Sequence, residues 1–411
     1  MSFIDSFDGQ FPSGKEKEWE LALLSMSKDK ADQFLDNSDL DFNGEHPDTM
    51  DFEDIRGFFD RYVDVVTSIG PETKGATVFD DRVDLARLED EGYWNKQFAD
   101  LAAADKVPGK DLAEFKAKVK RMSTGVAAVI PKNRLVRYEM DEFETFSELI
   151  LDHHNKETQN LTWSQSLKRY RGRFGCDPAI ARGSAFLVGD KYLISAAHNF
   201  ITYDLVTRYD FALGGNRTDK IFRFKTEEEM KEVYFAFDFQ TTGDGKRPSF
   251  TDLKIVSGKL VPGMHKLEPM NDEPFAKFDW ALIELEEGFP DRWKFKPNHD
   301  SELKEGDSLF TFGFPGGVPM KFTPGGTMVG SATTSFHTTL DTFSGNSGGP
   351  VLNVANMKLE GILISGKHDY NLINDSIQSR EYQWKHYVDG VAGEVCQSLA
   401  VFWNQIAEII N

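Results

Sequence analysis

Cysteine is scarce in this sequence, with only Cys176 and Cys396 among 411 residues. Secreted domains held together by disulfides carry more, which argues against that class, although one pair between these two cysteines stays open. Residues 1–6 have neither the basic nor the apolar segment of a secretory signal peptide. No run of about 18 apolar residues exists that could span a bilayer. We therefore expect a cytoplasmic protein that does not enter membranes.

Positive charge is also in short supply. The chain has 47 Lys and Arg against 67 Asp and Glu, which gives a formal net charge of −20. Such a molecule repels phosphate groups, so nucleic acids and anionic membrane surfaces are not expected partners. Hydrophobic residues still make up 40% of the chain, and 34 are Phe, so a large core can form. The length favours two or three domains.

The first part of the chain differs from the rest in its charge and in the spacing of its apolar residues. Residues 1–122 carry more than half of the excess negative charge, and apolar residues such as Phe52, Ile55 and Phe59 recur there at helical spacing. We predict an acidic helical domain over residues 1–122, with a regulatory or partner-binding role. Residues 123–411 would form the second domain.

One segment of this helical part has half of a calcium-binding pattern. Asp39, Asp41 and Asn43 place oxygen ligands at alternate positions before Gly44, as in an EF-hand loop. The closing glutamate should stand six residues after the glycine, where the sequence has Met50. Calcium is therefore a weak candidate, an acidic solvated loop is the more ordinary interpretation, and no other cofactor is expected.

From residue 123 onward the pattern changes to short strands separated by Gly and Pro. Residues 183–188 and 192–195 flank a turn and predict a hairpin, and residues 233–239 alternate in polarity as a half-buried strand does. A final amphipathic helix is predicted from one stripe of residues: Val395, Leu399, Phe402, Trp403, Ile406 and Ile410. A mainly β fold follows, a barrel or sandwich with a C-terminal helix. Further strands are expected at residues 126–131, 253–261, 279–286, 308–314, 327–340, 350–354 and 359–365.

Three residues could together carry nucleophilic chemistry. Ser347 sits in the glycine-rich turn Gly345-Asn346-Ser347-Gly348-Gly349-Pro350, which leaves its hydroxyl accessible. A serine hydroxyl needs a base, and the base needs an acid that fixes its tautomer. His198 at a strand end and Asp279 at a strand entrance are the candidates. Each could instead be an ordinary end or turn residue, but their joint occurrence is harder to dismiss.

These motifs give the chain from about 123 to 400 a resemblance to the trypsin-like serine peptidases of the chymotrypsin fold. It looks closest to their bacterial V8-like branch, the glutamyl endopeptidase-like enzymes. The resemblance implies a double six-stranded antiparallel β-barrel and a serine endopeptidase. The segments of this sequence that carry the resemblance are Gly183-Ser184-Ala185-Phe186-Leu187-Val188, Ile194-Ser195-Ala196-Ala197-His198, Asp279-Trp280-Ala281-Leu282, Gly313-Phe314-Pro315-Gly316-Gly317, Leu340-Asp341-Thr342-Phe343-Ser344-Gly345-Asn346-Ser347-Gly348-Gly349-Pro350-Val351 and Glu360-Gly361-Ile362-Leu363.

The resemblance also implies a role for each matching residue. Ser347 would attack the peptide carbonyl, His198 would act as general base and then general acid, and Asp279 would orient His198. The N–H groups of Gly345 and Ser347 would bind the oxyanion. The segment Ile364-Ser365-Gly366 would pair with the backbone of an extended substrate.

Departures from the family pattern are informative as well. Secreted relatives often have a disulfide where this chain has Asn199 and about Arg182, and its loss agrees with an intracellular protein. In trypsin-type zymogens an acid precedes the serine and pairs with a newly cut N-terminus. Asn346 stands there and cannot form that ion pair, so we expect any control of activity to come from the helical region instead.

Substrate preference is less determined. Asp341, followed by Thr342, lies six residues before Ser347, where trypsin-type enzymes carry the acid that selects Arg or Lys at P1. The V8-like branch often has this acid without that preference. Glutamate-specific members have a histidine where this chain has Leu363, which argues against glutamate. Basic P1 is therefore suspected.

Two other classes of protein compete with this interpretation. The serine turn also fits the elbow of α/β-hydrolases, but a strand follows it, and His198 and Asp279 both precede it. A protease-like binding or scaffold module without turnover is the second alternative, although all three residues of the triad are present. The serine peptidase hypothesis also has a second form, in which the peptidase is latent and is controlled by residues 1–122 or by calcium.

Overall fold

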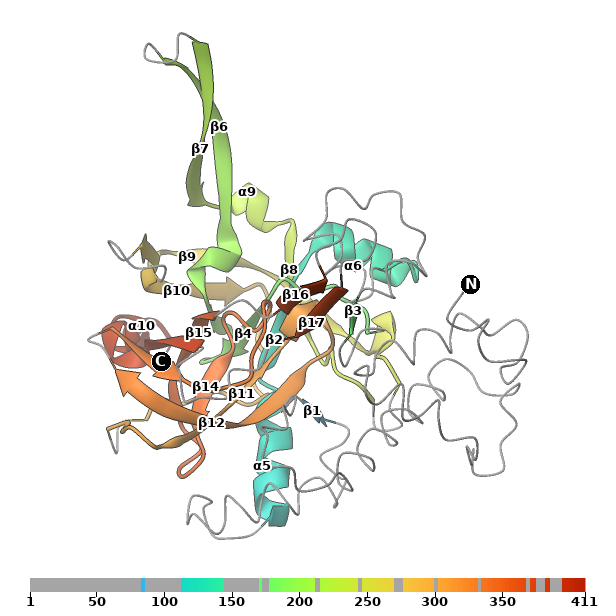
Figure 1. Ribbon diagram of the computed structural model, residues 1–411. Helices are drawn as coiled ribbons and strands as arrows, with labels where there is room; N and C mark the ends of the chain where they lie inside the picture. The colour runs from blue at the N-terminus through green and yellow to red at the C-terminus, as the bar shows by residue number, and fades with distance from the viewer. Residues whose placement is uncertain are drawn as a thin grey trace.

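Antiparallel strands close into two barrels in the computed structural model of the chain (Figure 1). This confirms the predicted double six-stranded β-barrel. No helix in the part of the chain that the structure describes is long and apolar enough to cross a membrane. The described residues are 83–85, 112–143, 170–171, 177–210, 215–242, 246–269, 276–298, 302–331, 334–366, 370–374, 381–384 and 394–410.

The first barrel has the strand order β10-β5-β4-β2-β8-β9, closed by pairing of β9 with β10. The predicted hairpin is present as β4 and β5, with Ala185 opposite Ser195. The strands are β2 (Val126–Pro131), β4 (Gly183–Leu187), β5 (Tyr192–Ser195), β8 (Val233–Phe237), β9 (Lys254–Pro269) and β10 (Ala276–Leu285).

Side chains on both faces of these strands are buried. On β8, Val233, Phe235 and Phe237 belong to one apolar cluster, whereas Ala236 belongs to a second cluster that includes Phe310 of the other barrel. Successive side chains of a strand point to opposite faces, so one set fills the barrel and the other joins the two barrels. Burying each large side chain is worth about 1.5–3 kcal/mol, which makes the joint between the barrels part of the core.

The second barrel has the order β12-β11-β14-β15-β18-β13, and pairing of β12 with β13 closes it. The strand expected at residues 327–340 is in fact two, because the chain turns between β12 and β13. A short strand, β1 (Val83–Asp84), pairs antiparallel with β12, on the edge of β12 opposite to β11. The barrel strands are β11 (Ser308–Gly313), β12 (Lys321–Ser331), β13 (Ser335–Thr338), β14 (Pro350–Asn353), β15 (Leu359–Gly366) and β18 (Glu394–Ser398).

The predicted C-terminal helix exists but is shorter than its apolar stripe suggested. Val395 lies in β18, which pairs with both β13 and β15, and Leu399 begins the 3-10 turn η8 (Leu399–Val401). The helix α10 starts only at Trp403 and ends at Ile410. Including Val395 and Leu399 in the helix was therefore wrong, since closing the barrel satisfies the backbone of residues 394–398 better than one more helical turn would.

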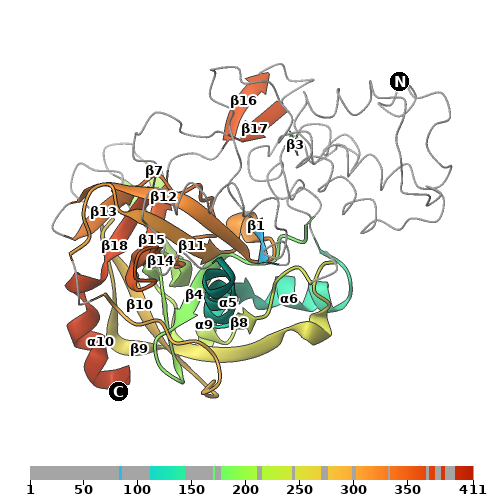
Figure 2. The ribbon, with the colours of Figure 1, turned by 90° about the horizontal axis from the view of Figure 1, so that it is seen from below.

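Parts of the predicted N-terminal domain pack against the barrels. The helix α5 (Leu112–Ser123, Figure 2) buries Phe115, Val119 and Met122. The Phe115 ring meets that of Phe310 edge-on at a centroid distance of 6.2 Å. The helix α6 (Lys132–Glu139) follows β2 directly. Most of residues 1–122 lie outside the described part of the chain, so the helical domain and its boundary after residue 122 stay predictions.

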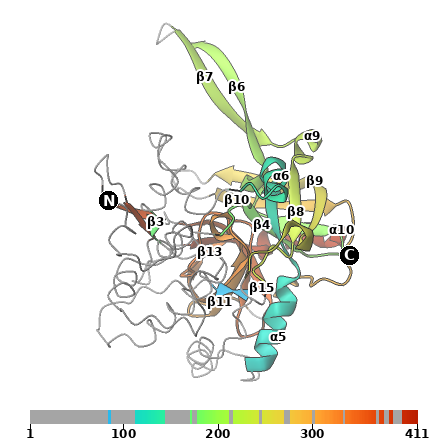
Figure 3. The ribbon, with the colours of Figure 1, turned by 90° about the vertical axis from the view of Figure 1, so that its right-hand side faces the viewer.

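A two-stranded hairpin leaves the first barrel directly after the segment that contains His198. Its strands are β6 (Ile201–Asp210) and β7 (Gly215–Phe224), which extend away from both barrels (Figures 1 and 3). This hairpin was not predicted from the sequence. Shorter elements are η5 (Ala197–Phe200), α9 (Glu227–Met230), η6 (Phe250–Asp252), η7 (Pro315–Gly317) and the small sheet of β3 (Tyr170–Arg171), β16 (Tyr370–Asn374) and β17 (Glu381–Trp384).

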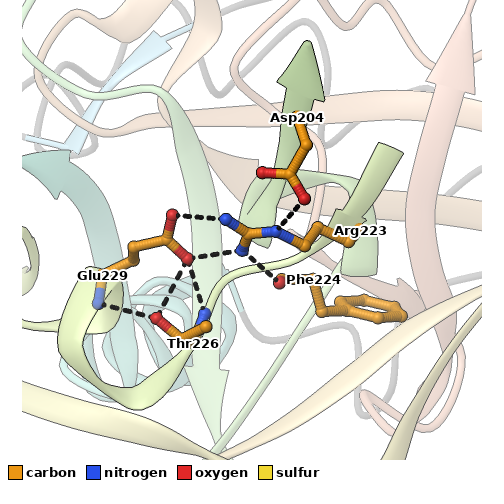
Figure 4. A network of polar contacts seen from close by, with 5 residues as sticks. All are labelled: Asp204, Arg223, Phe224, Thr226 and Glu229. Atoms are coloured by element: carbon orange, nitrogen blue, oxygen red, sulfur yellow. Dashed lines mark hydrogen bonds and ion pairs between the residues drawn. The ribbon is translucent and has the colours of Figure 1, made fainter. Parts of the chain in front are cut away.

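Arg223 fixes the base of this hairpin (Figure 4). Its guanidinium donates to Asp204 on the opposite strand at 2.9 Å and to both carboxylate oxygens of Glu229 at 2.6 and 2.9 Å. Glu229 also accepts from the backbone N–H of Thr226, whose hydroxyl caps α9. The hydrogen bonds from Arg223 are the main reason that the pKa of Glu229 falls to about 2. The hairpin is thus tied to α9 by a bidentate, charge-assisted contact.

Candidate active site

Strand pairing in the first barrel brings His198 and Asp279 together. Ser195 on β5 lies opposite Ala281 on β10, so the residues just after Ser195 meet those just before Ala281. The Nδ1 atom of His198 lies 2.6 Å from Oδ2 of Asp279, and the His198 backbone N–H donates to Oδ1 at 3.0 Å. Because a carboxylate accepts, Nδ1 carries the proton, which leaves Nε2 as the acceptor in the neutral ring.

The acid of this pair is buried and the imidazole is accessible. The Asp279 side chain is 4% exposed, whereas that of His198 is 37% exposed. The backbone N–H of Asp279 donates to Oε1 of Gln397 at 2.9 Å, and Gln397 is fully buried on β18. The second barrel therefore positions an acid that belongs to the first. Gln397 was not predicted to act at the site, because the residues from Val395 onward were expected to form a helix, whereas Gln397 lies on a strand.

The serine turn requires its glycines. Gly345 and Gly348 have φ angles of +101° and +91°, in the region that favours glycine. A Cβ on Gly348 would stand 2.0 Å from the Ser184 carbonyl oxygen and 2.4 Å from the Ser195 hydroxyl. The turn thus lies directly against the end of β5, which leads to His198.

The backbone N–H groups of the turn divide into two sets. Those of Asn346, Gly348 and Gly349 donate to Phe343, Leu363 and Asn346, respectively, at 2.7–2.9 Å. Those of Gly345 and Ser347 donate to no acceptor in the described part of the chain. Uncommitted N–H groups two residues apart, on either side of Asn346, are the donors that an oxyanion requires.

The carbonyl side of the turn is anchored to the first barrel. The Ser347 carbonyl accepts from the Ser184 N–H at 2.8 Å and from the Asn199 side-chain amide at 2.9 Å, and the Ser184 hydroxyl donates to the Gly345 carbonyl at 2.9 Å. The Ser344 carbonyl accepts from the Gly316 N–H at 2.5 Å. In a trans peptide the N–H points opposite to the carbonyl, so this last bond directs the Gly345 N–H away from Gly316.

Two of these anchoring residues were not predicted to act at the site. Ser184 appeared only within a family motif, and Asn199 only as the replacement for a cysteine. Both are buried polar residues beside the turn. Ser184 gave a signal as a polar residue within an otherwise apolar strand, whereas Asn199, directly after His198, gave no such signal.

The residues predicted to bind substrate come from two segments that the fold brings side by side. Asp341 and Thr342 are buried just before the serine turn, while Ile364, Ser365 and Gly366 end β15. Reciprocal backbone bonds join the segments, from Gly348 to Leu363 and from Leu363 to Gly349. The Thr342 hydroxyl also donates to Oε2 of Glu394 at 2.5 Å. The roles of these residues in substrate binding stay predictions.

The remaining sequence candidates lie elsewhere. Asp39, Asp41 and Asn43 are outside the described residues, and no group of three potential metal ligands occurs within them. Cys396 is a free cysteine buried on β18, and Cys176 is outside the described part. Burial, with a smaller effect of the Glu394 charge, raises the pKa of the Cys396 thiol well above its usual value. That thiol is therefore not a candidate nucleophile.

Two antiparallel six-stranded barrels that place a histidine, an acid and a serine turn between them define the class of chymotrypsin-fold serine peptidases. The family model of the trypsin-like peptidase domain matches residues 183–362. Residues 183–362 are thus similar to a trypsin-like peptidase domain, and this match supports a serine endopeptidase, a hydrolase of peptide bonds.

A Glu endopeptidase solved in complex with MPD is 15% identical, with a TM-score of 0.32, over 55% of this chain and 84% of that one. No curated protein matches the sequence. The V8-like branch and the P1 preference stay predictions.

Proposed function

We propose that this serine endopeptidase acts through Ser347, His198 and Asp279. His198 takes the proton of the Ser347 hydroxyl through Nε2 while Oγ attacks the scissile carbonyl carbon. The N–H groups of Gly345 and Ser347 stabilise the resulting oxyanion, a contribution of about 3–4 kcal/mol for each donor. His198 then gives this proton to the amine nitrogen as the C–N bond breaks, which leaves the acyl group as an ester on Oγ of Ser347. Water attacks this ester while His198 takes a proton from the water, and His198 returns that proton to Oγ as the carboxylic acid leaves.

One observation carries this proposal. A buried carboxylate pairs with His198 beside a turn whose Gly345 and Ser347 N–H groups have no acceptor among the described residues, although the other three N–H groups of residues 345–349 are used. Buried backbone donors of a turn are normally paired, within the protein or with ordered water. These two donors are instead available to a group that forms only during the reaction.

The test is labelling of the full-length protein with a fluorophosphonate, which reacts with an activated serine. The wild type should label at Ser347. Ser347→Ala should abolish labelling, and His198→Ala should slow it by about 10³-fold or more, since the base is lost. Ser344→Ala, an exposed serine of the same segment, is the matched control and should label normally. Absence of labelling, with and without calcium, would instead support the silent binding module.

The acidic N-terminal region is the proposed regulator of this activity, with a protein partner or calcium as the signal. This rests on its charge and helical pattern, since the region is mostly outside the described residues. A deletion should end before β1, because residues 83–85 and 112–123 pack with the barrels. Removing residues 1–78 should raise labelling and peptide cleavage if the region inhibits. Equal rates, with and without calcium, would argue against control. The cytoplasmic location stays a prediction.

A further inference from the structure

The hairpin of β6 and β7 is attached directly to the segment that carries His198. Its first strand begins at Ile201, three residues after His198, and the Lys225 N–H that follows its second strand donates to the Phe200 carbonyl at 2.8 Å. The hairpin forms a sheet of two strands that extends away from both barrels (Figures 1 and 3). The polar network in Figure 4 ties its base to α9. Side chains near this base are therefore held at a fixed place relative to the proposed base of the reaction.

One side of the hairpin near its base is apolar and the other side is charged. Tyr203 pairs in register with Phe222, and their rings meet edge-on at a centroid distance of 6.2 Å. Leu205 lies two residues further along β6, so it points to the same side. Leu205 is 64% exposed and Phe222 is 68% exposed. Asp204 points to the opposite side, where it accepts from Arg223. We call the side chains of Tyr203, Leu205 and Phe222 the hairpin face.

Exposed side chains of this kind are concentrated on the hairpin. Six large hydrophobic residues are exposed in the described part of the chain, and four of them lie on β6 and β7. The other two are Val136 and Met140, at the end of α6. A two-stranded hairpin is only marginally stable in water by itself, and a layer packed on its apolar side would stabilise it. Apolar patches that gather in one place are typical of interaction sites.

The hairpin face continues inward to the candidate active site. Phe224 comes next on the same side of β7, is half-buried, and meets the ring of His265 at a centroid distance of 4.4 Å. Figure 4 shows the Phe224 ring outside the polar network of the hairpin base. Phe224 also packs against the apolar cluster that includes Ala197, the residue before His198. The exposed side chains are thus the outer end of a line of apolar groups that begins beside His198.

Size and distance indicate what covers the hairpin face. Three side chains of this kind, partly exposed, offer on the order of 300–400 Å² of surface, less than the ~800 Å² per partner that a stable protein–protein interface buries. A short extended segment of polypeptide fits such an area, whereas a second copy of the chain needs more. Tyr203 follows His198 by five residues, so their Cα atoms are at most about 18 Å apart. An extended polypeptide held beside His198 therefore reaches the hairpin face with about five or six further residues.

We propose that the hairpin face binds an apolar segment of the polypeptide substrate, about five residues or more from the scissile bond. The proposal rests on the proposed function, because it needs a substrate that is cleaved at Ser347. Leucine- or phenylalanine-like side chains of that segment cover Leu205 and Phe222 and remove them from water, which favours association. The enzyme then selects polypeptides by an apolar stretch at a set distance from the cleaved bond, in addition to the residues next to that bond.

The experiment compares three peptides that share one sequence around the scissile bond, taken from a site that the wild type cleaves in a denatured protein. One peptide is short, and two extend on both sides, with Leu and Phe in one and with Ser and Gln in the other. The wild type should cleave the extended apolar peptide with a kcat/KM about 10-fold or more above the other two. The double variant Leu205→Ser, Phe222→Ser should reduce this advantage to less than about threefold, because little apolar area is left to bury. The loss should be confined to the extended apolar peptide.

Two kinds of control variant are available. Val136→Ser and Met140→Ser remove exposed hydrophobic side chains at the end of α6, away from the hairpin. Ile221→Ser removes one from the hairpin itself, on the side of Asp204, with which Ile221 pairs in register. All three should keep the advantage of the extended apolar peptide. A double variant that keeps this advantage would overturn the proposal, and so would one that loses the same factor on all three peptides and in fluorophosphonate labelling.

A competition measurement on the full-length wild type covers the case in which the double variant does not fold. The apolar extension, added as a separate peptide without the cleaved sequence, should inhibit cleavage of the extended apolar peptide but not of the short one. Inhibition of both peptides, or of neither, would overturn the proposal.

Two further outcomes separate the alternatives. A wild type that elutes as a dimer from a sizing column, and a double variant that elutes as a monomer, would assign the hairpin face to a second copy of the chain and overturn the proposal. Normal labelling of Ser347 without any preference for the extended apolar peptide would overturn the docking surface alone. Absence of both labelling and cleavage would instead overturn the proposed function, and the docking surface with it.

Discussion

The side-chain amide of Asn199 donates to the backbone carbonyl of Ser347 at 2.9 Å. The same nitrogen also donates to the Ser195 hydroxyl at 3.1 Å. Asn199 directly follows His198, so one buried amide joins the segment of the predicted base to the turn of the predicted nucleophile. Family members with a cysteine at this position tie the histidine segment down covalently. Here hydrogen bonds across the two barrels do so.

Replacing Asn199 by Ala should therefore impair both stability and catalysis. The change leaves the Ser347 carbonyl with only its bond from Ser184, and we expect a loss of about 1–3 kcal/mol in the free energy of unfolding. Fluorophosphonate labelling should slow by about 10-fold or more, because small displacements of reacting groups are costly. Urea denaturation and labelling kinetics measure the two effects. Asn356→Ala, which removes an amide from the turn between β14 and β15, should leave labelling unchanged.

Replacing Gly348 by Ala should prevent formation of the serine turn. The new Cβ would combine a strained φ of +91° with a 2.0 Å approach to the Ser184 carbonyl oxygen. Gly306→Ala is an informative control, since it has a similar φ of +89° but nothing within 4 Å of the added atom. Gly306→Ala should cost only the conformational strain, about 1–3 kcal/mol, and should label normally. Equal losses in the two variants would show that strain alone matters.

Lys321 on β12 is completely buried and contacts two acids. It pairs with Asp177 at 2.9 Å and with Asp84 of β1, whose Oδ1 also accepts from the Thr241 hydroxyl at 2.8 Å. Lys321→Met would leave two buried carboxylates without this cation. The free energy of unfolding should fall by about 3–5 kcal/mol, which a thermal or urea midpoint would report.

A surface pair supplies the comparison for this variant. Lys132 bonds Glu232 at 2.8 Å, with side chains 44% and 61% exposed. Exposed pairs gain little because water and salt screen them. Lys132→Met should leave the midpoint where it is. A midpoint that is equally unaffected by Lys321→Met would contradict the importance of the buried cluster.

Glu360 should make stability depend on pH near neutrality. Burial is the main cause that raises its pKa to about 7, against 4.5 for the ordinary side chain. The folded state then holds a proton that the unfolded state has lost, so stability decreases as the pH rises from about 4.5 to 7. Glu360→Gln should remove this slope and stabilise the protein above pH 7, by on the order of 2 kcal/mol after allowance for partial exposure. Unfolding midpoints of both proteins at pH 5 and pH 8 measure the difference.

The sequence allowed most of the barrel strands to be predicted, because their patterns are local. Phe235 and Phe237 alternate with neighbours along β8, and the turn at Gly189-Asp190 separates β4 from β5. The same local reasoning failed at Val395. Its apolar spacing suits a helix, but residues 394–398 complete a barrel through partners far away in the chain. Tertiary pairing overrides a periodic pattern there.

The candidate site shows the same contrast between residues found from local patterns and residues whose contacts are distant in the chain. His198, Asp279 and Ser347 could be found because each stands in a short motif that its chemistry requires. Gln397 and Glu394 could not, because their contacts with Asp279 and Thr342 join residues more than 50 positions apart. The hairpin of β6 and β7 was missed as well, since its mixed polar and apolar residues have no clear period.

The pairing of β1 with β12 has a consequence for how the chain could be processed. A cut anywhere between residues 85 and 112 would leave Val83 hydrogen-bonded to the second barrel and Asp84 in its buried contact with Lys321. Such a cut would yield a nicked, two-chain enzyme rather than a peptidase freed from a prodomain. The two pieces should separate on a denaturing gel yet elute together from a sizing column under native conditions.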